Sequence, residues 1–418
     1  METLSLLLDR AALVDRYRAG RARTAGIFAS IAPSAYYEAP IPLRHPFVFY
    51  EGHLPGFAYL VLHERALHGS PIDPKLELLF ERGIDPATAD HTHRRSDWPV
   101  RSAVRRFGAA CDAALIDDIA HAELDDPSNP LLVDAEALFN ILEHEEMHHE
   151  TLMYIIHRLP ADAKHAPSIE VRDVMPERRD PIAIPAGRAT LGQRRGSAFG
   201  WDNEFDEHAV DVAAFGIDAH DVTNGDYLAF VRDGGAPPPF WIERDGAWLL
   251  RGAYHEIPLP LSWPVYASHD DTEAFCTWAG ARLPSEPEYH RAAFGTPSGD
   301  ERAFPWGSAA PAPQHGNFDF RRFDPEPAGS SPAGASAWGV EDLIGNGWEW
   351  TSTPFAPFDG FTPMASYPPY SADFFDGRHY VMKGASPVTS SNLIRRSFRN
   401  WFFADYAYMY ATFRRAYS

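Results

Sequence analysis

Cysteine is scarce in this chain: its 418 residues include two, Cys111 and Cys276. The two are far apart and expected in different domains, so they provide neither a disulfide framework nor a cysteine-based metal site. Clusters of Lys and Arg interleaved with aromatic residues are also missing, and the net charge is −21. These features argue against nucleic acid and anionic membranes as partners.

Long apolar runs are missing as well. No stretch approaches the length of a membrane span, and residues 1–23 mix Leu with Asp and Arg instead of forming the apolar core of a signal peptide. We therefore expect a soluble cytoplasmic protein without a membrane partner. With 45% hydrophobic and 13% aromatic residues, the chain is suited to two or three globular domains.

Proline and glycine are absent between Pro130 and Pro160, which predicts a long helix over about 132–159. His144 and His148 are four residues apart in it and therefore share one face. Apolar side chains would bury a flank of this helix, and buried imidazoles are costly unless their nitrogens are satisfied. The spacing favours a metal site, and two histidines in a charged surface turn are the alternative.

The same residues also match H-E-x-x-H, the signature of zinc peptidases, with Glu145 as the general base. The metzincin continuation is absent, because Thr151 and Tyr154 stand where Gly and His would follow. Beyond residue 159 the chain becomes rich in proline and polar residues, which removes the helix that usually supplies another ligand. A zinc peptidase is therefore a distant alternative.

Helical spacing over 4–31, 48–67, 102–121 and 134–159 predicts an antiparallel four-helix bundle in residues 1–160. In the second helix, Gly52 and Pro55 flank His53 and predict a distorted turn that aims its ring. His53 is a candidate third nitrogen for the histidine pair, or else a satisfied core histidine.

Two irregular stretches interrupt or follow the bundle. Residues 81–101 are expected to be either a solvated loop or a lid over a substrate, and they carry His91, His93, Arg94, Arg95 and Arg101. Residues 161–180 lack periodicity and are expected to be a linker between domains.

From 181 to 418 the chain predicts an irregular α+β domain. Short β-like runs at 182–185, 189–191 and 210–215 alternate with Gly, Pro and Asp. Thr223 and Ser268 are expected to cap helices over 224–232 and 270–279. We find no internal repeat.

Three phrases of this second part together resemble the formylglycine-generating-enzyme fold, a C-type-lectin-like domain. The pattern His144-x3-His148, with Gly52-His53 far upstream, resembles the DinB-like iron domain of the ergothioneine sulfoxide synthases. Both domains occur in that family in this order, so the resemblance covers essentially the whole chain. The phrases are Gly280-Ala281-Arg282-Leu283-Pro284-Ser285-Glu286-Pro287-Glu288-Tyr289, Phe304-Pro305-Trp306-Gly307 and Gly345-Asn346-Gly347-Trp348-Glu349-Trp350-Thr351, with Phe413-Arg414 at the end.

The resemblance implies an O2-dependent non-heme iron enzyme. It implies that His53, His144 and His148 bind Fe(II), with open positions for O2 and a chalcogen. It also implies that the stretch Asn400-Trp401-Phe402 holds hercynine, the trimethylated betaine of histidine. A quaternary ammonium favours aromatic faces, which agrees with this assignment. A formylglycine generator is disfavoured, because no cysteine follows Cys276.

Three positions depart from the pattern of the sulfur enzymes. Phe355 or Phe358 stands where those enzymes commonly have a catalytic Tyr, Tyr406 where they often have an Arg, and Met147 where they often have a Gln. This combination resembles the selenoneine synthases, which join selenium from a selenosugar to hercynine. The alternatives are an ergothioneine sulfoxide synthase that uses γ-glutamylcysteine or cysteine, and a non-catalytic lectin-like binding module. The sequence does not identify the residue that handles protons.

Overall fold

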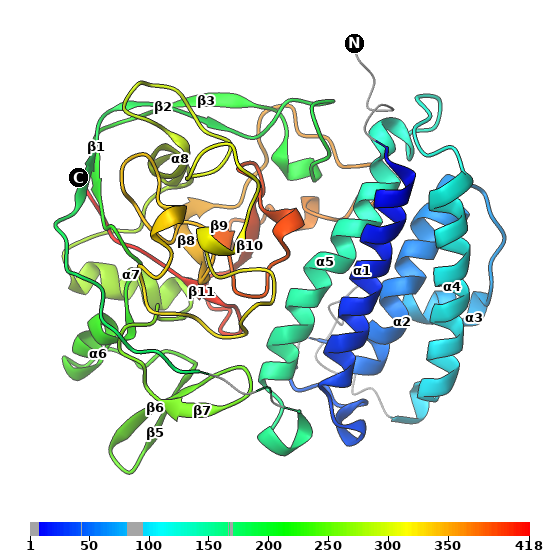
Figure 1. Ribbon diagram of the computed structural model, residues 1–418, viewed down its shortest axis with the longest axis horizontal. Helices are drawn as coiled ribbons and strands as arrows, with labels where there is room; N and C mark the ends of the chain where they lie inside the picture. Colours follow the sequence, from blue (N-terminus) through cyan, green and yellow to red (C-terminus); the bar gives the residue numbers. More distant parts are fainter. Residues whose placement is uncertain (1–7, 43, 82–94, 166, 168–169) are drawn as a thin grey trace. The chain divides into compact units, whose positions relative to one another are not determined.

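The computed structural model describes residues 8–42, 44–81, 95–165, 167 and 170–418. The chain forms two compact units (Figure 1). The first contains Met1–Pro167 together with two later segments, Gly196–Phe199 and Met364–Pro368, and the second contains the rest. The sequence predicts one division of the chain at a linker, and it does not predict that these two segments join the first unit.

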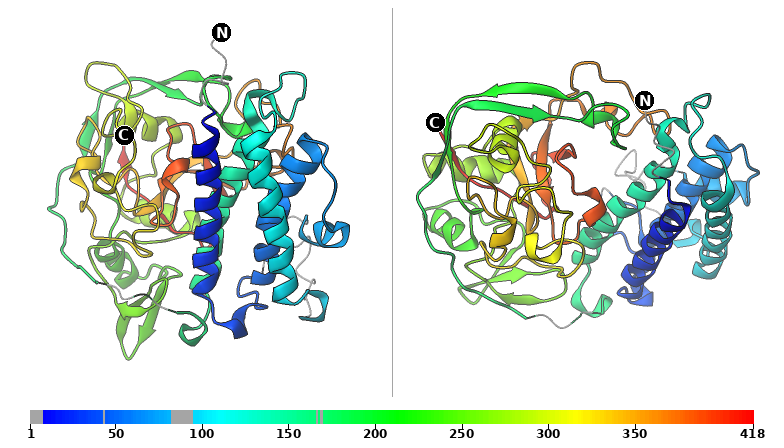
Figure 2. Two further views of the ribbon diagram at one scale, coloured as in Figure 1. Left: turned by 45° about the vertical axis from the view of Figure 1, so that its right-hand side comes forward. Right: turned by 45° about the horizontal axis from the view of Figure 1, so that its top comes forward.

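The first unit is built from helices. Helices α1, α4 and α5 run side by side in both views of Figure 2, and α2 packs against α4 and α5. The predicted helical bundle is therefore present, whereas its kinship with DinB-like domains stays a prediction. The helices are α1 (Arg10–Ala29), α2 (Phe47–Ala58), α3 (Pro74–Phe80), α4 (Arg101–His121) and α5 (Glu136–His157).

The predicted turn around His53 is wrong. Helix α2 runs through Gly52 and Pro55 and continues directly into a π-helix, Tyr59–Ala66. Gly52 has a packing role instead: a Cβ atom there would lie 2.3 Å from the ring of Phe80. The glycine thus lets α3 approach α2 closely.

Much of the predicted loop over 81–101 lies outside the described residues, including His91, His93 and Arg94. Arg101 begins α4, where its guanidinium pairs with the Glu51 carboxylate at 2.9 Å and lies over the ring of Tyr36. These contacts give Arg101 a structural role in the bundle.

Among the described residues, the second unit combines small sheets with three α-helices. The sheet orders are β1-β4-β12, β10-β9-β8-β11, β2-β3 and β5-β6-β7. The predicted run at 210–215 is two strands in different sheets. Its first part belongs to β3, which pairs with β2, and its last residue begins β4, which pairs with β1. The strands are β1 (Ile182–Ile184), β2 (Gly187–Leu191), β3 (His208–Val212), β4 (Phe215–Ile217), β5 (Trp241–Arg244), β6 (Ala247–Arg251), β7 (Glu256–Pro258), β8 (Gly347–Pro354), β9 (His379–Ala385), β10 (Asn400–Phe403), β11 (Ala411–Thr412) and β12 (Ala416–Tyr417).

Capping residues define the helices of this unit. The hydroxyls of Thr223 and Ser268 accept hydrogen bonds from backbone N–H groups at the starts of α6 and α7, which confirms both predicted caps. Ser285 caps a third helix, which the sequence pattern did not predict. The helices are α6 (Asn224–Arg232), α7 (His269–Trp278) and α8 (Glu286–Phe294).

A buried ion network fixes the C-terminal end of the second unit. The guanidinium of Arg414, fully buried, lies 2.5 Å from Glu349 on β8 and 3.0 Å from Asp221. It thereby joins the last residues to the central sheet. No helix among the described residues is long and apolar enough to cross a membrane.

Candidate functional site

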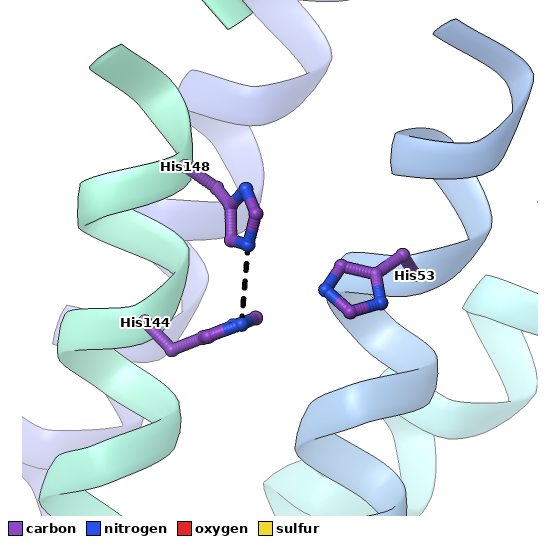
Figure 3. A group of neighbouring side chains, drawn as sticks. All are labelled: His53, His144 and His148. Atoms are coloured by element: carbon purple, nitrogen blue, oxygen red, sulfur yellow. Dashed lines mark hydrogen bonds between the residues drawn. The ribbon is translucent and has the colours of Figure 1, made fainter. Parts of the chain in front are cut away.

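Three buried histidines meet inside the first unit (Figure 3). His144 and His148 project from successive turns of α5, and His53 faces them from α2. One nitrogen from each ring lies within 4.8 Å of the others. The structure therefore brings together the helical pair and the distant histidine that the sequence singled out, and their role as metal ligands stays a prediction.

The hydrogen bonding of His53 fixes its tautomer. Its Nδ1 lies 2.7 Å from the backbone carbonyl oxygen of Phe80, which can only accept, so Nδ1 carries the proton. Its Nε2 then presents a lone pair, and this buried atom has no hydrogen-bond partner. An oriented imidazole of this kind is typical of metal ligands, whose second nitrogen usually donates to a carbonyl or carboxylate.

Burial keeps the three rings neutral. It lowers the pKa of His53 to about 4, although the hydrogen bond to Phe80 opposes this change. It also holds the pKa values of His144 and His148 well below the usual range, and the neighbouring histidines lower them further. Neutral imidazoles are the form that binds metal ions.

The spacing of the nitrogens fits a metal ion. The Nε2 atoms of His144 and His148 are 3.1 Å apart. Two ligands at right angles and about 2.1 Å from a metal would be separated by about 3.0 Å. A hydrogen bond between these two rings would satisfy only that pair and would leave Nε2 of His53 unsatisfied. A single metal ion bound to one nitrogen of each ring would satisfy all three of these nitrogens.

Aromatic side chains surround the triad. Phe49 stacks on His53 with ring centroids 4.7 Å apart, and Phe57 stacks on His144 at 3.7 Å. The ring of Tyr50 lies 5.7 Å from that of His148. These rings restrict the rotamers of the histidines and shield the triad from water.

Tyr367 is a neighbour of the triad that the sequence did not reveal. Its ring centroid lies 6.1 Å from that of His144 and 5.2 Å from that of Phe57. The segment Met364–Pro368 carries it into the first unit, where Ser366 accepts a hydrogen bond from Asn140 on α5 at 2.8 Å. The family pattern directs attention to the positions soon after the Trp-Glu-Trp-Thr phrase, whereas this phenol lies further along the chain.

A second group of candidate residues forms an aromatic cluster in the second unit. Trp401 on β10 stacks on Phe355 with centroids 4.2 Å apart and an interplanar angle of 5°. Tyr370 meets it edge-on at 5.2 Å, and Phe374 lies at 5.8 Å. The faces of aromatic rings suit a cation without hydrogen-bond donors.

The neighbours of Trp401 on β10 are also ordered. The side-chain oxygen of Asn400 accepts a hydrogen bond from the backbone N–H of Trp401 at 2.9 Å. This hydrogen bond fixes the orientation of the Asn400 amide, and with it the direction in which the NH2 group can donate. Phe402 stacks on Tyr406 at 4.6 Å. The structure brings these four predicted residues together within one unit.

Comparisons with known proteins agree with this arrangement of elements. A family model described as the sulfatase-modifying factor enzyme 1-like domain matches residues 168–418. A hercynine oxygenase from Mycolicibacterium thermoresistibile is 32% identical over 364 residues, which cover 79% of this chain and 77% of that protein. The chain belongs to the family of hercynine oxygenases and ergothioneine sulfoxide synthases.

Two further relatives support the assignment to the hercynine oxygenase family. A hercynine oxygenase from Mycolicibacterium smegmatis is 33% identical over 337 residues, covering 72% of this chain and 74% of that protein. The ergothioneine biosynthesis protein 1 of Schizosaccharomyces pombe is 29% identical over 419 residues, covering 89% of this chain and 52% of that protein. The predicted family resemblance is therefore confirmed.

The surroundings of Glu145 disagree with a zinc peptidase and leave the hercynine oxygenase family as the better assignment. The Glu145 carboxylate accepts hydrogen bonds from Arg21 at 2.8 Å and from Thr24 at 2.5 Å, both on α1. Burial alone would raise the pKa of Glu145, but Arg21 and the hydrogen bonds lower it to about 2. A carboxylate so stabilised is a poor general base for water.

Two of the positions that depart from the sulfur enzymes of the family lie in contrasting environments. Phe358 packs over the guanidinium of Arg399 at 4.1 Å, and Arg399 pairs with the buried Glu286 at 3.1 Å. Phe358 thus covers an internal ion pair of the second unit. Met147 is partly exposed on α5, directly before His148.

Proposed function

We propose that this protein is an O2-dependent non-heme iron enzyme that joins selenium or sulfur to the imidazole C2 of hercynine, with a selenosugar as its preferred donor. The convergence of three neutral, buried imidazoles carries the proposal. Membership of the hercynine oxygenase family supplies the substrate class, because relatives named for hercynine align over most of the chain.

His53, His144 and His148 would hold the iron. Three imidazoles suit Fe(II) and leave coordination positions open. Bound Fe(II) would supply O2 activation and a binding site for the chalcogen of the donor. The reaction would gain from holding the donor close to the second substrate. The chain itself contributes the tautomer of His53 and the aromatic wall that excludes water.

Trp401 and its aromatic neighbours would receive the trimethylammonium group of hercynine. Their rings are pre-packed against each other, so little side-chain entropy is lost when the ligand binds. The oriented NH2 group of Asn400 would donate to the carboxylate of the betaine.

Tyr367 is the group that we assign to proton handling. It is a phenol beside His144, on a segment that Ser366 attaches to α5. Its presence means that Phe358 is not by itself an argument against thiol chemistry. Tyr406 and Met147 then carry the preference for a selenosugar, because a site without a carboxylate-binding guanidinium at that position disfavours γ-glutamylcysteine.

Side-by-side kinetics test the proposal. Iron-loaded enzyme is given hercynine and O2 with a selenosugar, γ-glutamylcysteine or cysteine, and kcat/KM is compared. We expect the selenosugar to be preferred and the His144→Ala variant to be inactive with every donor. Preference for γ-glutamylcysteine would instead assign the chain to the ergothioneine sulfoxide synthases. Zinc-dependent peptide cleavage without O2 uptake would overturn the whole proposal.

A further inference from the structure

A second group of possible metal ligands lies in the second unit, at the start of α7 (Figure 1). His269, Asp270 and Glu273 each place a ligand atom within 4.8 Å of the others. Acidic side chains are common in the first turns of helices, where the helix dipole stabilises them. The two carboxylates alone therefore indicate nothing, and the buried His269 distinguishes this cluster.

His269 has a fixed tautomer and an unsatisfied nitrogen. Its side chain is fully buried and stacks on Tyr380 with centroids 3.8 Å apart. Its Nε2 lies 3.1 Å from the backbone carbonyl oxygen of Thr351, so Nε2 carries the proton. Its Nδ1 is left with a lone pair and has no hydrogen-bond partner. An unsatisfied buried nitrogen costs free energy unless a ligand reaches it.

The lone pair of His269 lies near a second acceptor. Its Nδ1 lies 4.0 Å from a carboxylate oxygen of Glu273. With the ring proton on Nε2, His269 offers no donor to this carboxylate. A cation between the two groups satisfies both.

Further negative charge gathers at the same place. The carboxylates of Asp405 and Asp271 lie close enough to Asp270 to act on it electrostatically. Asp271 is occupied as the capping partner of Ser268, whose hydroxyl donates to it at 2.6 Å. The backbone N–H of Asp270 donates to Ala404 at 3.2 Å, which places α7 beside the turn after β10. A divalent cation would offset the repulsion among these carboxylates.

We propose that His269, Asp270 and Glu273 form a binding site for a divalent first-row transition metal, with Zn2+ as its occupant. One imidazole nitrogen and two carboxylate oxygens suit Zn2+, whereas Ca2+ and Mg2+ prefer oxygen ligands throughout. Water completes the coordination on the exposed side of Glu273. The ion would have a structural role, because it holds the first turn of α7 together.

Zinc binding by the 418-residue chain tests the site. Metal-free protein carrying His144→Ala and His148→Ala, which removes the first triad, is dialysed against Zn2+ alone and its bound metal is measured. We expect one zinc per chain. Adding Glu273→Gln should weaken the affinity about tenfold or more, since even outer-shell changes cost about 10–100-fold at metal sites. The Glu273 side chain is 56% exposed, so this change does not threaten folding.

Asp271→Asn is the matched control, because it removes an equal charge from the same helical turn without removing a ligand. It should weaken zinc binding far less than Glu273→Gln does, whereas His269→Asn should abolish tight binding. Equal zinc affinity with and without Glu273→Gln, in the protein that lacks the first triad, would overturn the proposal. So would an absence of binding below millimolar Zn2+.

Discussion

Under the proposed function, the single side chain of Trp401 would help to determine which ligand is accepted. Phe355 covers one of its faces, and Tyr370 and Phe374 also contact it. A quaternary ammonium gains about 0.5–2 kcal/mol from such rings, whereas a primary ammonium also needs hydrogen-bond acceptors to replace its water. Under the proposed function, the cluster would thus favour hercynine over histidine.

We therefore expect Trp401→Ala to weaken hercynine binding by about 2–30-fold and to reduce the discrimination against histidine. Isothermal titration with both ligands measures this. Trp278→Ala, at an exposed tryptophan of α7, is the control and should bind hercynine normally. Equal hercynine affinity in Trp401→Ala and the parent protein would exclude an ammonium-binding role for this ring.

Lys383 gives the second unit a measurable pH dependence. Its ammonium group on β9 is buried and donates to the carbonyl oxygen of Phe398 at 2.6 Å. Burial lowers its pKa from 10.5 to about 8, although Glu286 opposes this. Between these values the unfolded chain binds more protons than the folded chain, so the free energy of unfolding rises with pH.

Lys383→Met should remove this rise. From pH 8 to pH 10.5 the parent should gain up to about 3 kcal/mol relative to the variant. Urea unfolding of both proteins at matched pH gives the difference in the free energy of unfolding. Subtracting the values of the variant removes the contribution of the other titrating groups. Parallel stability curves for the two proteins would contradict a depressed pKa for Lys383.

Helix α2 illustrates how one element positions a ligand. Gly52 lets the ring of Phe80 lie against the helix, and the carbonyl of Phe80 orients the next residue, His53. A side chain at position 52 therefore acts on the triad through α3 without touching it. Position 52 connects helix packing with the tautomer of a candidate ligand.

Gly52→Ala should destabilise the first unit by about 1–3 kcal/mol through overpacking and should lower iron affinity. Gly26→Ala is the matched control on α1, because a Cβ atom at that position would meet no other atom within 4 Å. It should stabilise the helix by about 0.5–1 kcal/mol and leave iron binding intact. Unfolding curves and iron content distinguish the two variants. Normal iron binding by Gly52→Ala would show that the packing of Phe80 does not affect the metal centre.

At the scale of the whole molecule, the two candidate metal sites belong to different units. The histidine triad lies in the first unit and the His269 cluster in the second. Each metal should therefore stabilise its own unit, because an ion that binds only the folded state stabilises by mass action.

Anaerobic Fe(II) at 100 times its Kd should stabilise the first unit by about 2.7 kcal/mol. Hydrogen exchange resolved by peptide should show added protection in α2 and α5. The His144→Ala variant should lose this protection while the exchange of α6 stays unchanged. Protection spread equally over both units would argue that iron binding is not confined to the triad.

Some features of this protein follow from local sequence. The gap in proline and glycine and the four-residue spacing of His144 and His148 place both rings on one helical face, because helical geometry depends on near neighbours. The caps at Thr223 and Ser268 are local for the same reason. The family phrases of the second part likewise needed no structure.

Other features were decided only by tertiary structure. The tautomer of His53 depends on a carbonyl of α3, and α3 itself was missed because it is short. Tyr367 reaches the triad because Ser366 bonds to Asn140, a contact between residues 226 apart in sequence. Glu145 matches a general base in sequence, yet Arg21 and Thr24 of another helix occupy it. Hydrogen bonds and burial between distant segments set these roles, and no local pattern encodes them.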